Sequence, residues 1–228
     1  MSPWKAAHAG DHFDTIDTPA LVLDLDAFER NMKRLQEAMS KAGVRLRPHA
    51  KSHKCPEIAL RQIKAGAIGI CCQKISEAAV FVDAGVDDIL ITNQLVGEQK
   101  VAHAIDLAKR ATIGVLVDHD DQVSAFARAS ALRQIQIDVY IDVDVGMGRC
   151  GVTSIEQAVS MALQIDQAPY LNFMGLQCYH GSPCQYLSLK TRSAVGNCHS
   201  HCKLTLANIV YGYQLCLNGD SALYMTSL

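Results

Sequence analysis

Residues 113–144 read IGVLVDHDDQVSAFARASALRQIQIDVYIDVD and hold one complete unit of the pattern that decides the fold. Two apolar runs rich in Val and Ile, Ile113 to Val117 and Ile137 to Val143, are each followed directly by an aspartate. A stretch of helical period separates the two runs. Short buried runs joined by a helix are typical of a strand, a crossover helix and a parallel strand, so this segment predicts an α/β fold.

The same rhythm runs from residue 18 to about residue 180. Apolar runs recur roughly every 20 to 35 residues, which is about the length of one βα unit. They predict further strands at residues 44–46, 68–72, 89–92 and 173–178, and an earlier strand at residues 21–24. The helices between them show an apolar stripe (Phe28, Met32, Leu35, Met39) and start or stop signals (Pro56, Gly85, Ser154).

Polar residues follow or end each of the six main strands. Six successive parallel strands fit either a doubly wound open sheet or a partial (β/α)8 TIM-type barrel with about six βα units. In barrels, the chemistry lies where the strands run out into the βα loops. The residues at these positions are His49, Lys51, Gln73, Asn93, Asp118, Asp142, Asp144, Tyr179 and His180. Because all of them are polar, the sequence favours the barrel.

Composition excludes several classes of protein. The 228 residues carry 21 basic and 23 acidic side chains, a formal net charge of −2 and a sequence pI near 6.5, so the chain lacks the basic excess of a nucleic-acid or anionic-membrane binder. No apolar run reaches the roughly 18 residues of a membrane span, and residues 1–17 lack the apolar core of a signal peptide, which predicts a cytoplasmic protein. Nine cysteines without regular spacing predict reduced thiols and no disulfide framework.

The composition changes after residue 182. Residues 183–228 contain four charged residues, no Glu and four of the nine cysteines, and they show no helical or strand period. The sequence therefore predicts three parts: an N-terminal extension (1–17), a barrel part (18–182) and an aberrant tail (183–228). An out-of-frame or alternatively spliced end would give this pattern.

Lys51 is the first candidate for chemistry. It lies in the run Arg47-Pro-His-Ala-Lys-Ser-His-Lys54, between a predicted strand and a predicted helix. A lysine that is partly enclosed at a strand end loses solvation, and its pKa falls toward the range that amine nucleophiles need. The alternative is an ordinary solvated lysine in a loop. His49 and His53 have the i, i+4 spacing of a helical metal pair, but Pro48 and the strand context argue against a helix there.

An ordered series of motifs resembles one family of enzymes. The motifs are Asp17-Thr-Pro-Ala-Leu-Val-Leu-Asp24, Pro48-His-Ala-Lys51, Cys72-Gln-Lys74, Asp83-Ala-Gly85, Asp87-Asp-Ile-Leu-Ile-Thr-Asn93, Asp142-Val-Asp-Val-Gly-Met-Gly-Arg-Cys-Gly-Val152 and Gly175-Leu-Gln-Cys-Tyr-His-Gly181. Over residues 15–182 the chain resembles D-threonine aldolases and D-serine dehydratases, which are alanine-racemase-like, fold-type III pyridoxal-phosphate enzymes. The resemblance favours a reactive Lys51 over the solvated alternative.

The resemblance implies a (β/α)8 barrel that holds pyridoxal 5′-phosphate at its mouth. Lys51 matches the lysine that binds the cofactor covalently, and Arg149 matches an arginine expected near the phenolic oxygen of the ring. Tyr179 and His180 match a Tyr-His-Gly expected against the ring, the alternative being a buried aromatic pair. The predicted cofactor site is completed by two side chains at the ends of the first two strands, His49 and Gln73.

Two further patterns suggest a nucleotide-binding motif and a zinc site, but each has a favoured alternative interpretation. Residues 146–151 satisfy the G-x-G-x-x-G pattern of a dinucleotide fingerprint, but the acidic residue that the fingerprint needs would be Asp166, at a helix end. The resemblance explains the same glycines as a tight turn that presents Arg149. In the tail, Cys198-His-Ser-His-Cys202 has residue types suited to zinc, but its spacing is too compressed for a familiar finger, so chance enrichment is favoured.

The resemblance also implies an activity and its partners. The substrate is a small D-β-hydroxy-amino acid, which an aldolase cleaves to glycine and an aldehyde, whereas a dehydratase removes the Cα proton and expels the hydroxyl. Intact relatives are expected to be homodimers with a second, β-rich domain and a divalent metal, Mn²⁺ or Zn²⁺, whose ligands are not recognised here. Because neither the second domain nor the metal ligands are recognised in this sequence, it predicts a truncated chain of low or no activity. The alternative is a non-catalytic remnant that at most binds pyridoxal phosphate or pairs with intact copies.

Overall fold

The computed structural model describes residues 7–8, 10–179, 213–217 and 223–227. Six parallel strands alternate with helices in the predicted order. The strands are β1 (Arg45–Leu46), β2 (Ile70–Cys72), β3 (Asp88–Gln94), β4 (Thr112–Val117), β5 (Ile137–Val143) and β6 (Leu171–Cys178). The helices are η1 (Phe13–Thr15, a 3-10 helix), α1 (Leu25–Lys41), α2 (Pro56–Lys64), α3 (Ile75–Asp83), α4 (Glu98–Leu107), α5 (Asp120–Arg133) and α6 (Ile155–Gln167).

The strands form a closed ring of eight. Two strands from the C-terminal part, β7 (Tyr213–Leu217) and β8 (Leu223–Ser227), lie between β6 and β1, and the strand order is β1-β8-β7-β6-β5-β4-β3-β2. β7 runs antiparallel to both β6 and β8, and β8 runs parallel to β1. Backbone hydrogen bonds also join the first and last strands of this order, β1 and β2. Just after β1, Ala50 N donates to Cys71 O (2.8 Å), and Cys71 N donates to Pro48 O (2.7 Å).

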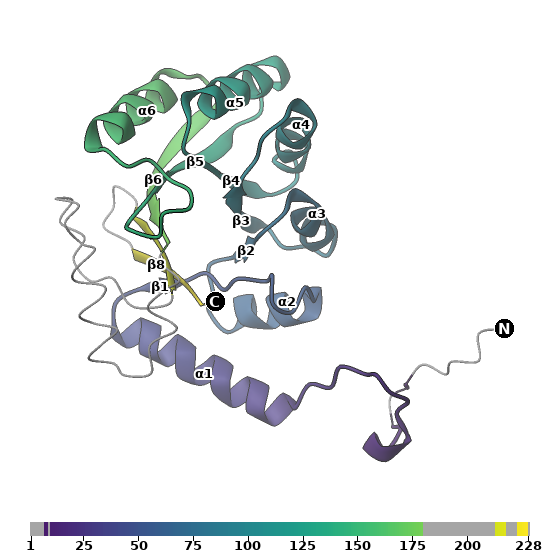
Figure 1. The fold of residues 1–228 in the computed structure, drawn as a ribbon. Coiled ribbons are helices and arrows are strands. Elements are labelled where there is room, and N and C mark those ends of the chain that lie inside the picture. Colours follow the sequence, from purple (N-terminus) through teal and green to yellow (C-terminus); the bar gives the residue numbers. More distant parts are fainter. Residues whose placement is uncertain (1–6, 9, 180–212, 218–222, 228) are drawn as a thin grey trace.

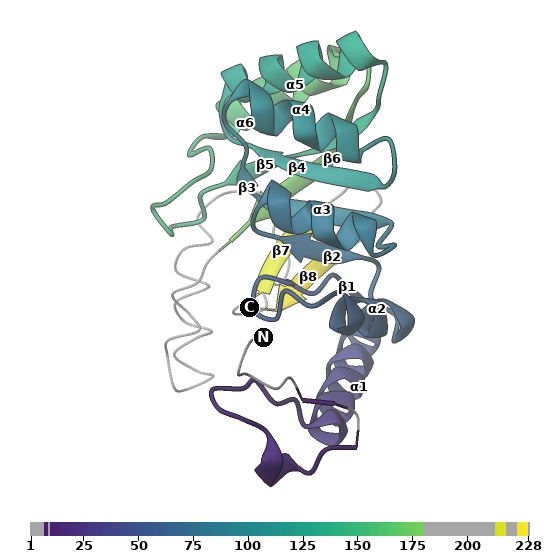
Figure 2. The same cartoon turned by 90° about the vertical axis from the view of Figure 1, so that its right-hand side faces the viewer.

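Helices cover the outside of this ring. Figure 1 shows α2 to α6 following one another around strands β2 to β6, with α1 below them, and Figure 2 shows the same layers from the side. This arrangement of βα units confirms the predicted α/β fold with a partial TIM-type barrel. The two strands β7 and β8, which the sequence pattern does not predict, differ from barrel strands because they form an antiparallel pair.

Successive residues of each strand face in turn toward the helices and toward the barrel interior. In β4, for example, Val115 and Val117 lie in the main core with helix side chains, whereas Leu116 belongs to a second cluster made of strand residues only. This inner apolar layer comprises Cys71, Leu90, Leu116 and Tyr140. Polar pairs lie on either side of it along the strands. They are Arg47–Asp88 and Asp138–Asn172 toward the amino ends, and Gln94–Asp142 and Asp142–Gln177 toward the carboxyl ends.

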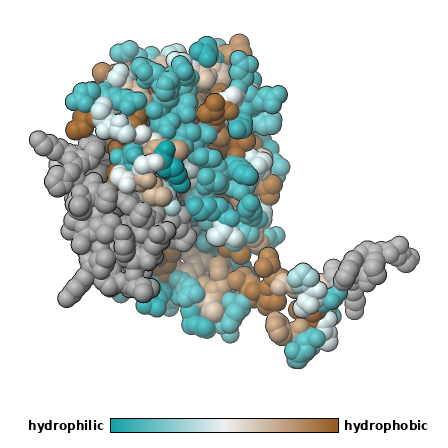
Figure 3. Space-filling model, in the orientation of Figure 1, coloured by the Kyte–Doolittle hydropathy of each residue, from teal (hydrophilic) through white to brown (hydrophobic). Residues whose placement is uncertain are grey.

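Several local predictions are confirmed and one is wrong. Pro56 is the first residue of α2, and the Ser154 hydroxyl caps α6 by accepting from Gln157 N (3.1 Å). Residues 21–24, predicted as a strand, are not one, because a strand forms only beside a hydrogen-bonded neighbour and none of the described strands pairs with this segment. Leu21 is fully exposed, and Figure 3 shows apolar surface where this part of the chain joins the body.

No helix in the described part of the chain has both the length and the apolar character to cross a bilayer. Cys55, Cys71, Cys72, Cys150 and Cys178 are free thiols. The cysteines of the Cys198–Cys202 motif lie outside the described residues.

Candidate active site

The carboxyl ends of the parallel strands bring the predicted polar residues to one end of the barrel, called here the barrel mouth. His49 and Lys51 follow β1, and Gln73 follows β2. Tyr179 follows β6, and the segment of residues 144–151, called here the Arg149 loop, follows β5. His180, the remaining predicted residue, lies outside the described residues.

His49 is buried and fixes the main chain of Lys51. Its Nδ1 accepts a hydrogen bond from Lys51 N (3.2 Å), so the ring proton lies on Nε2, which contacts Thr92 Oγ1 at 2.9 Å. The Thr92 hydroxyl in turn donates to the Cys72 carbonyl (3.2 Å). Burial, reinforced by the Lys51 charge, lowers the pKa of His49 to about 4. The imidazole is therefore a neutral support for Lys51, with both nitrogens engaged inside the protein.

Lys51 is half-buried and its amine is activated. Burial lowers the pKa of Lys51, and the positive charge of Arg149 lowers it further. Cys71 and Glu77 act in the opposite direction without reversing the shift. A larger fraction of the Lys51 amine is therefore neutral near pH 7 than for a solvated lysine, which is the state required for nucleophilic attack.

Arg149 and Tyr179 come together at the barrel mouth from different strands. The guanidinium carbon of Arg149 lies 4.6 Å from the centre of the Tyr179 ring, a cation–π contact. The positive charge of Arg149 also acts on Lys51, which follows β1 at the same end of the barrel. Two cations at one end of the barrel suit an anionic ligand.

The Arg149 loop is held by two carboxylates. The Asp144 side chain accepts hydrogen bonds from Gly146 N (2.9 Å) and Gly148 N (3.1 Å), and Asp118 Oδ2 accepts one from Gly151 N (3.0 Å). The loop then returns to β5, because Val152 pairs with Val143 before α6 begins. The glycines therefore form a tight turn instead of a helix N-terminus, which disfavours the dinucleotide reading of this motif.

Gln73 is fixed through its main chain. The Glu77 carboxylate accepts from Gln73 N (2.9 Å) and Lys74 N (3.3 Å), which caps the start of α3. The other oxygen of Glu77 forms an ion pair with Lys54 (3.1 Å), from the turn after β1. These contacts hold the ends of β1 and β2 together beside Lys51.

Asp142 is a buried carboxyl that the sequence places at a strand end but not among the site residues. Its Oδ2 accepts from Gln94 Nε2 (2.7 Å), and its Oδ1 lies 3.5 Å from Gln177 Nε2. Burial raises the pKa of Asp142 to about 6, and the Asp118 charge adds to the shift, whereas Gln94, Arg149 and Gln177 oppose it. The available signal was a polar residue inside an apolar strand, at Asp142 and again at Gln177.

The sequence predicts Asn93 as the polar residue at the end of β3, but Gln94 is the residue that donates a hydrogen bond to Asp142. The register with β4 shifts between Ile91 and Gln94, an irregularity that re-aims the following side chains. A period-2 pattern read from the sequence cannot show such a bulge, so Gln94 was missed.

No group of three or more His, Cys, Asp or Glu side chains within the described ranges could hold a metal ion.

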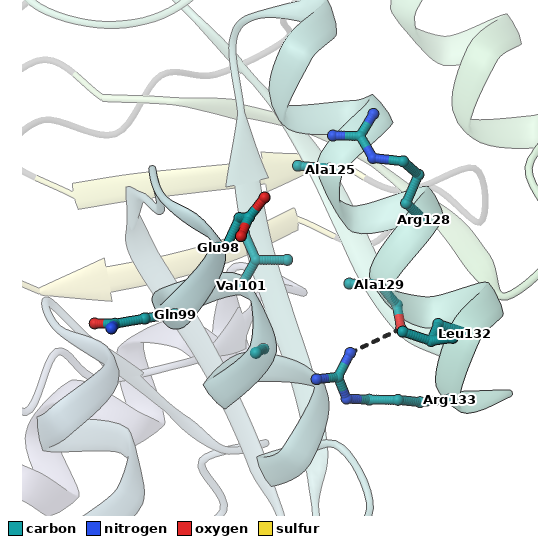
Figure 4. A pocket seen from close by; sticks show the side chains of 9 residues that line it. Glu98, Gln99, Val101, Ala125, Arg128, Ala129, Leu132 and Arg133 are labelled. Atoms are coloured by element: carbon teal, nitrogen blue, oxygen red, sulfur yellow. Dashed lines mark hydrogen bonds between the residues drawn. The ribbon is translucent and has the colours of Figure 1, made fainter.

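A groove of about 450 Å³ lies between α4 and α5 on the outside of the barrel (Figure 4). It is lined by the apolar side chains of Val101, Ala125 and Leu132 and by the charged side chains of Glu98, Arg128 and Arg133. It shares no residue with the barrel mouth.

Residues 23–197 match the model of the alanine racemase N-terminal domain. Among curated proteins, the chain is 49% identical over 189 residues to a D-threonine aldolase from Arthrobacter sp., covering 83% of this chain and 50% of the relative. It is 35% identical over 150 residues to a D-threo-3-hydroxyaspartate dehydratase from Delftia sp. (strain HT23), covering 65% of this chain and 39% of the relative.

The fold is also similar to solved structures. The crystal structure of D-threonine aldolase from Filomicrobium marinum superposes with a TM-score of 0.75 at 45% identity, covering 81% of this chain and 51% of that one. The chain thus spans about half the length of these two D-threonine aldolases.

Proposed function

Because the chain belongs to the alanine racemase N-terminal domain family, we propose that it forms the cofactor-binding barrel of a pyridoxal-phosphate-dependent lyase for D-β-hydroxy-amino acids. The preferred reaction is that of a D-threonine aldolase: the Cα–Cβ bond breaks, the β-hydroxyl becomes a carbonyl, and D-threonine yields glycine and acetaldehyde. The observation that carries the proposal is Lys51, a half-buried amine of lowered pKa at the same end of the barrel as Arg149.

The residues present fit pyridoxal phosphate. The cofactor offers an aldehyde to an amine and several negative charges to cations, and the barrel mouth presents a half-buried amine together with a guanidinium. The Tyr179 ring supports the guanidinium from β6. The donor set therefore agrees with the chemistry of the cofactor, and with the roles that the resemblance implies.

Each side chain has a proposed task. When bound, pyridoxal phosphate supplies an electron sink for negative charge that develops on the substrate. Lys51 bonds to the cofactor, and His49 positions Lys51 by accepting from its backbone N–H. Arg149 stays charged and orients the phenolic oxygen with its planar fork. Gln73, Tyr179 and His180 complete the proposed cofactor contacts.

A dehydratase activity is the second candidate, supported by the similarity to D-threo-3-hydroxyaspartate dehydratase. In that reaction Lys51 is the proposed acceptor of the Cα proton, because its lowered pKa leaves part of the amine neutral. The barrel mouth residues serve both reactions, so product analysis must separate them. A divalent metal, Mn²⁺ or Zn²⁺, is proposed for either reaction and belongs in the assay.

The test has a labelling arm and a product arm. The purified chain is incubated with pyridoxal phosphate, reduced with borohydride and digested, and the pyridoxyl-lysine is mapped by mass spectrometry. We expect the label on Lys51 and its loss in Lys51→Ala. The product arm measures glycine and acetaldehyde from D-threonine, and pyruvate from D-serine, with Mn²⁺ or Zn²⁺ added and L-threonine as the stereochemical control.

The outcomes are distinct. Glycine from D-threonine supports the aldolase, and pyruvate from D-serine supports the dehydratase. A label on Lys51 without either product supports the narrower alternative, a barrel that binds the cofactor without turnover. Specific labelling of Lys54 or Lys74 in place of Lys51 would overturn the assignment of the site.

A further inference from the structure

A series of three hydrogen bonds begins at the main chain of Lys51 and joins the ends of β1, β2 and β3. Lys51 N donates to His49 Nδ1 (3.2 Å), and His49 Nε2 lies 2.9 Å from Thr92 Oγ1. The Thr92 hydroxyl then donates to the Cys72 carbonyl, the last of β2 (3.2 Å). Both side chains in the series are buried, with His49 at 5% exposure and Thr92 at 6%.

The Thr92 hydroxyl determines which nitrogen of His49 carries the proton. A hydroxyl has one proton, and that of Thr92 is donated to the Cys72 carbonyl, so its oxygen must accept from His49. Nε2 is therefore the protonated nitrogen, and Nδ1 has a free lone pair. The N–H of Lys51 donates to Nδ1 and requires the same tautomer, so the two ends of the series agree.

The turn that carries Lys51 is anchored in two different ways. Ala50 N donates to the Cys71 carbonyl on β2 (2.8 Å), so the start of the turn is tied to a strand backbone. The N–H of Lys51 is instead held by the side chain of His49. A side chain can rotate without disrupting the sheet, so this second anchor depends on the group that fixes the imidazole, which is Thr92.

Loss of the Thr92 hydroxyl would leave the imidazole without a satisfactory arrangement. With the proton on Nε2, a buried N–H lacks its acceptor, and an unmade buried hydrogen bond is costly. With the proton on Nδ1, the ring would face the N–H of Lys51 donor against donor. Either arrangement weakens the bond between His49 and Lys51.

We propose that Thr92 is a positioning residue for Lys51: its hydroxyl holds the His49 imidazole in the tautomer that accepts from Lys51 N, and so fixes the turn from which the Lys51 amine meets the cofactor. Thr92 acts through His49 and is assigned no contact of its own with the cofactor. The inference rests on the proposed function in one respect, namely that Lys51 is the lysine that bonds to pyridoxal phosphate.

The first test uses the apoprotein. The tautomer of His49 is determined from its ¹⁵N NMR signals, which are assigned by their loss in His49→Gln. Hydrogen exchange at the Lys51 amide reports the bond to Nδ1, and exchange at the Ala50 amide, which is bonded to the Cys71 carbonyl, is the control within the same molecule. We expect the Nε2–H tautomer in wild type, and in Thr92→Val a rise of about tenfold in the exchange rate of Lys51 relative to that of Ala50.

Two further variants separate the hydroxyl from the rest of the side chain. Thr92→Ser keeps the hydroxyl and must keep the exchange ratio within about threefold of wild type. Ser130→Ala is the matched control, because Ser130 on α5 is fully buried and its hydroxyl has no hydrogen-bond partner in the described part of the chain. Should Thr92→Val fail to fold, Thr92→Cys, whose thiol is only a weak acceptor, replaces it under the same expectations.

The second test measures the attachment of pyridoxal phosphate to Lys51. Each protein is titrated with the cofactor, reduced with borohydride and digested, and the labelled fraction of Lys51 is measured by mass spectrometry. We expect the half-saturating cofactor concentration to rise about tenfold in Thr92→Val. It should stay within about threefold of wild type in Thr92→Ser and Ser130→Ala.

The outcomes separate the two claims. Absence of label on Lys51 in wild type would contradict the proposed function, while the tautomer and the exchange ratio would still decide the inference. An Nδ1–H tautomer in wild type, or an exchange ratio in Thr92→Val equal to that of wild type, would overturn the positioning role. The same holds if wild type is labelled on Lys51 and Thr92→Val reaches half-saturation at the same cofactor concentration.

Discussion

His49 shows how a single buried ring couples stability to pH. Its folded pKa of about 4 lies below the ordinary value of 6.5, so the unfolded chain binds the proton more readily. The contribution of His49 to stability is therefore complete above about pH 6.5 and is lost as the pH falls toward 4.

We expect His49→Gln, which offers one donor and one acceptor at similar places, to flatten this dependence. Between pH 7 and pH 4 the wild type should lose about 3 kcal/mol more of its free energy of unfolding than His49→Gln. Urea denaturation at a series of pH values measures the difference. Parallel pH profiles for the two proteins would show that His49 is not the buried neutral group described here.

Arg149 differs from a lysine at the same place because its planar guanidinium lies over the Tyr179 ring. Arg149→Lys keeps the charge but loses the fork and much of the stacking, so cofactor affinity should fall several-fold. Arg149→Ala removes the charge as well, and affinity should fall by about tenfold or more. A spectroscopic titration with pyridoxal phosphate gives the ranking, and equal affinities for all three proteins would place Arg149 outside the site.

At the scale of elements, the Arg149 loop depends on one glycine far more than on another. Gly151 has φ +105°, and a Cβ there would overlap the backbone of Val143 and Asp144. Gly148 has φ +66° and open space around its Cα, so an alanine there costs only about 1 kcal/mol of backbone strain.

Gly151→Ala should therefore displace the loop and lower cofactor affinity by about tenfold or more, whereas Gly148→Ala should stay within about threefold of wild type. The same absorbance titration measures both variants, and circular dichroism checks that each remains folded. A larger loss in Gly148→Ala than in Gly151→Ala would contradict this account of the loop.

The sequence was sufficient to predict elements whose side chains carry their own pattern. The strand at residues 137–143 is predicted with its observed bounds, since Ile and Val alternate there with Asp138, Tyr140 and Asp142. Residues 21–24 carry an equally apolar run, but a strand also needs a partner, and pairing is not encoded locally. Strands β7 and β8 show the converse, because they gain their pairing from β6 and β1 and not from a visible period.

In the candidate site, too, the sequence predicts some features and misses others. The positions of Lys51, Gln73 and Tyr179 at one end of the barrel were predictable, because strand ends in a parallel barrel converge. Arg149 came from the resemblance to a known family, and the cofactor contacts of all four residues stay predictions. The contacts of Asp142 with Gln94 and Gln177 were not predictable, because they depend on a register shift in β3 and on the curvature that brings β3 near β5. Patterns along the chain give the direction of a side chain, whereas distances across the barrel come only from the closed sheet.

At the scale of the whole molecule, closure of the sheet depends on the last two strands. Without β7 and β8, β1 and β6 would each expose an unpaired edge, and the inner apolar layer would lie open on one side. Gln177, which supports Asp142, sits on the part of β6 that pairs with β7. Closure of the ring and order at the barrel mouth are therefore connected through β6.

We expect deletion of residues 212–228 to lower the melting temperature by roughly 4 to 8 °C, corresponding to about 2 kcal/mol, because two backbone ladders are lost. The exposed edges should also cause concentration-dependent association, visible by size-exclusion chromatography. Deletion of residues 1–16 is the control, since the described residues of that segment are largely exposed and η1 lies away from the barrel in Figure 1. If the C-terminal deletion instead left both the melting temperature and the monodispersity unchanged, the six parallel strands would be stable without closure, and β7 and β8 would have no part in holding the site.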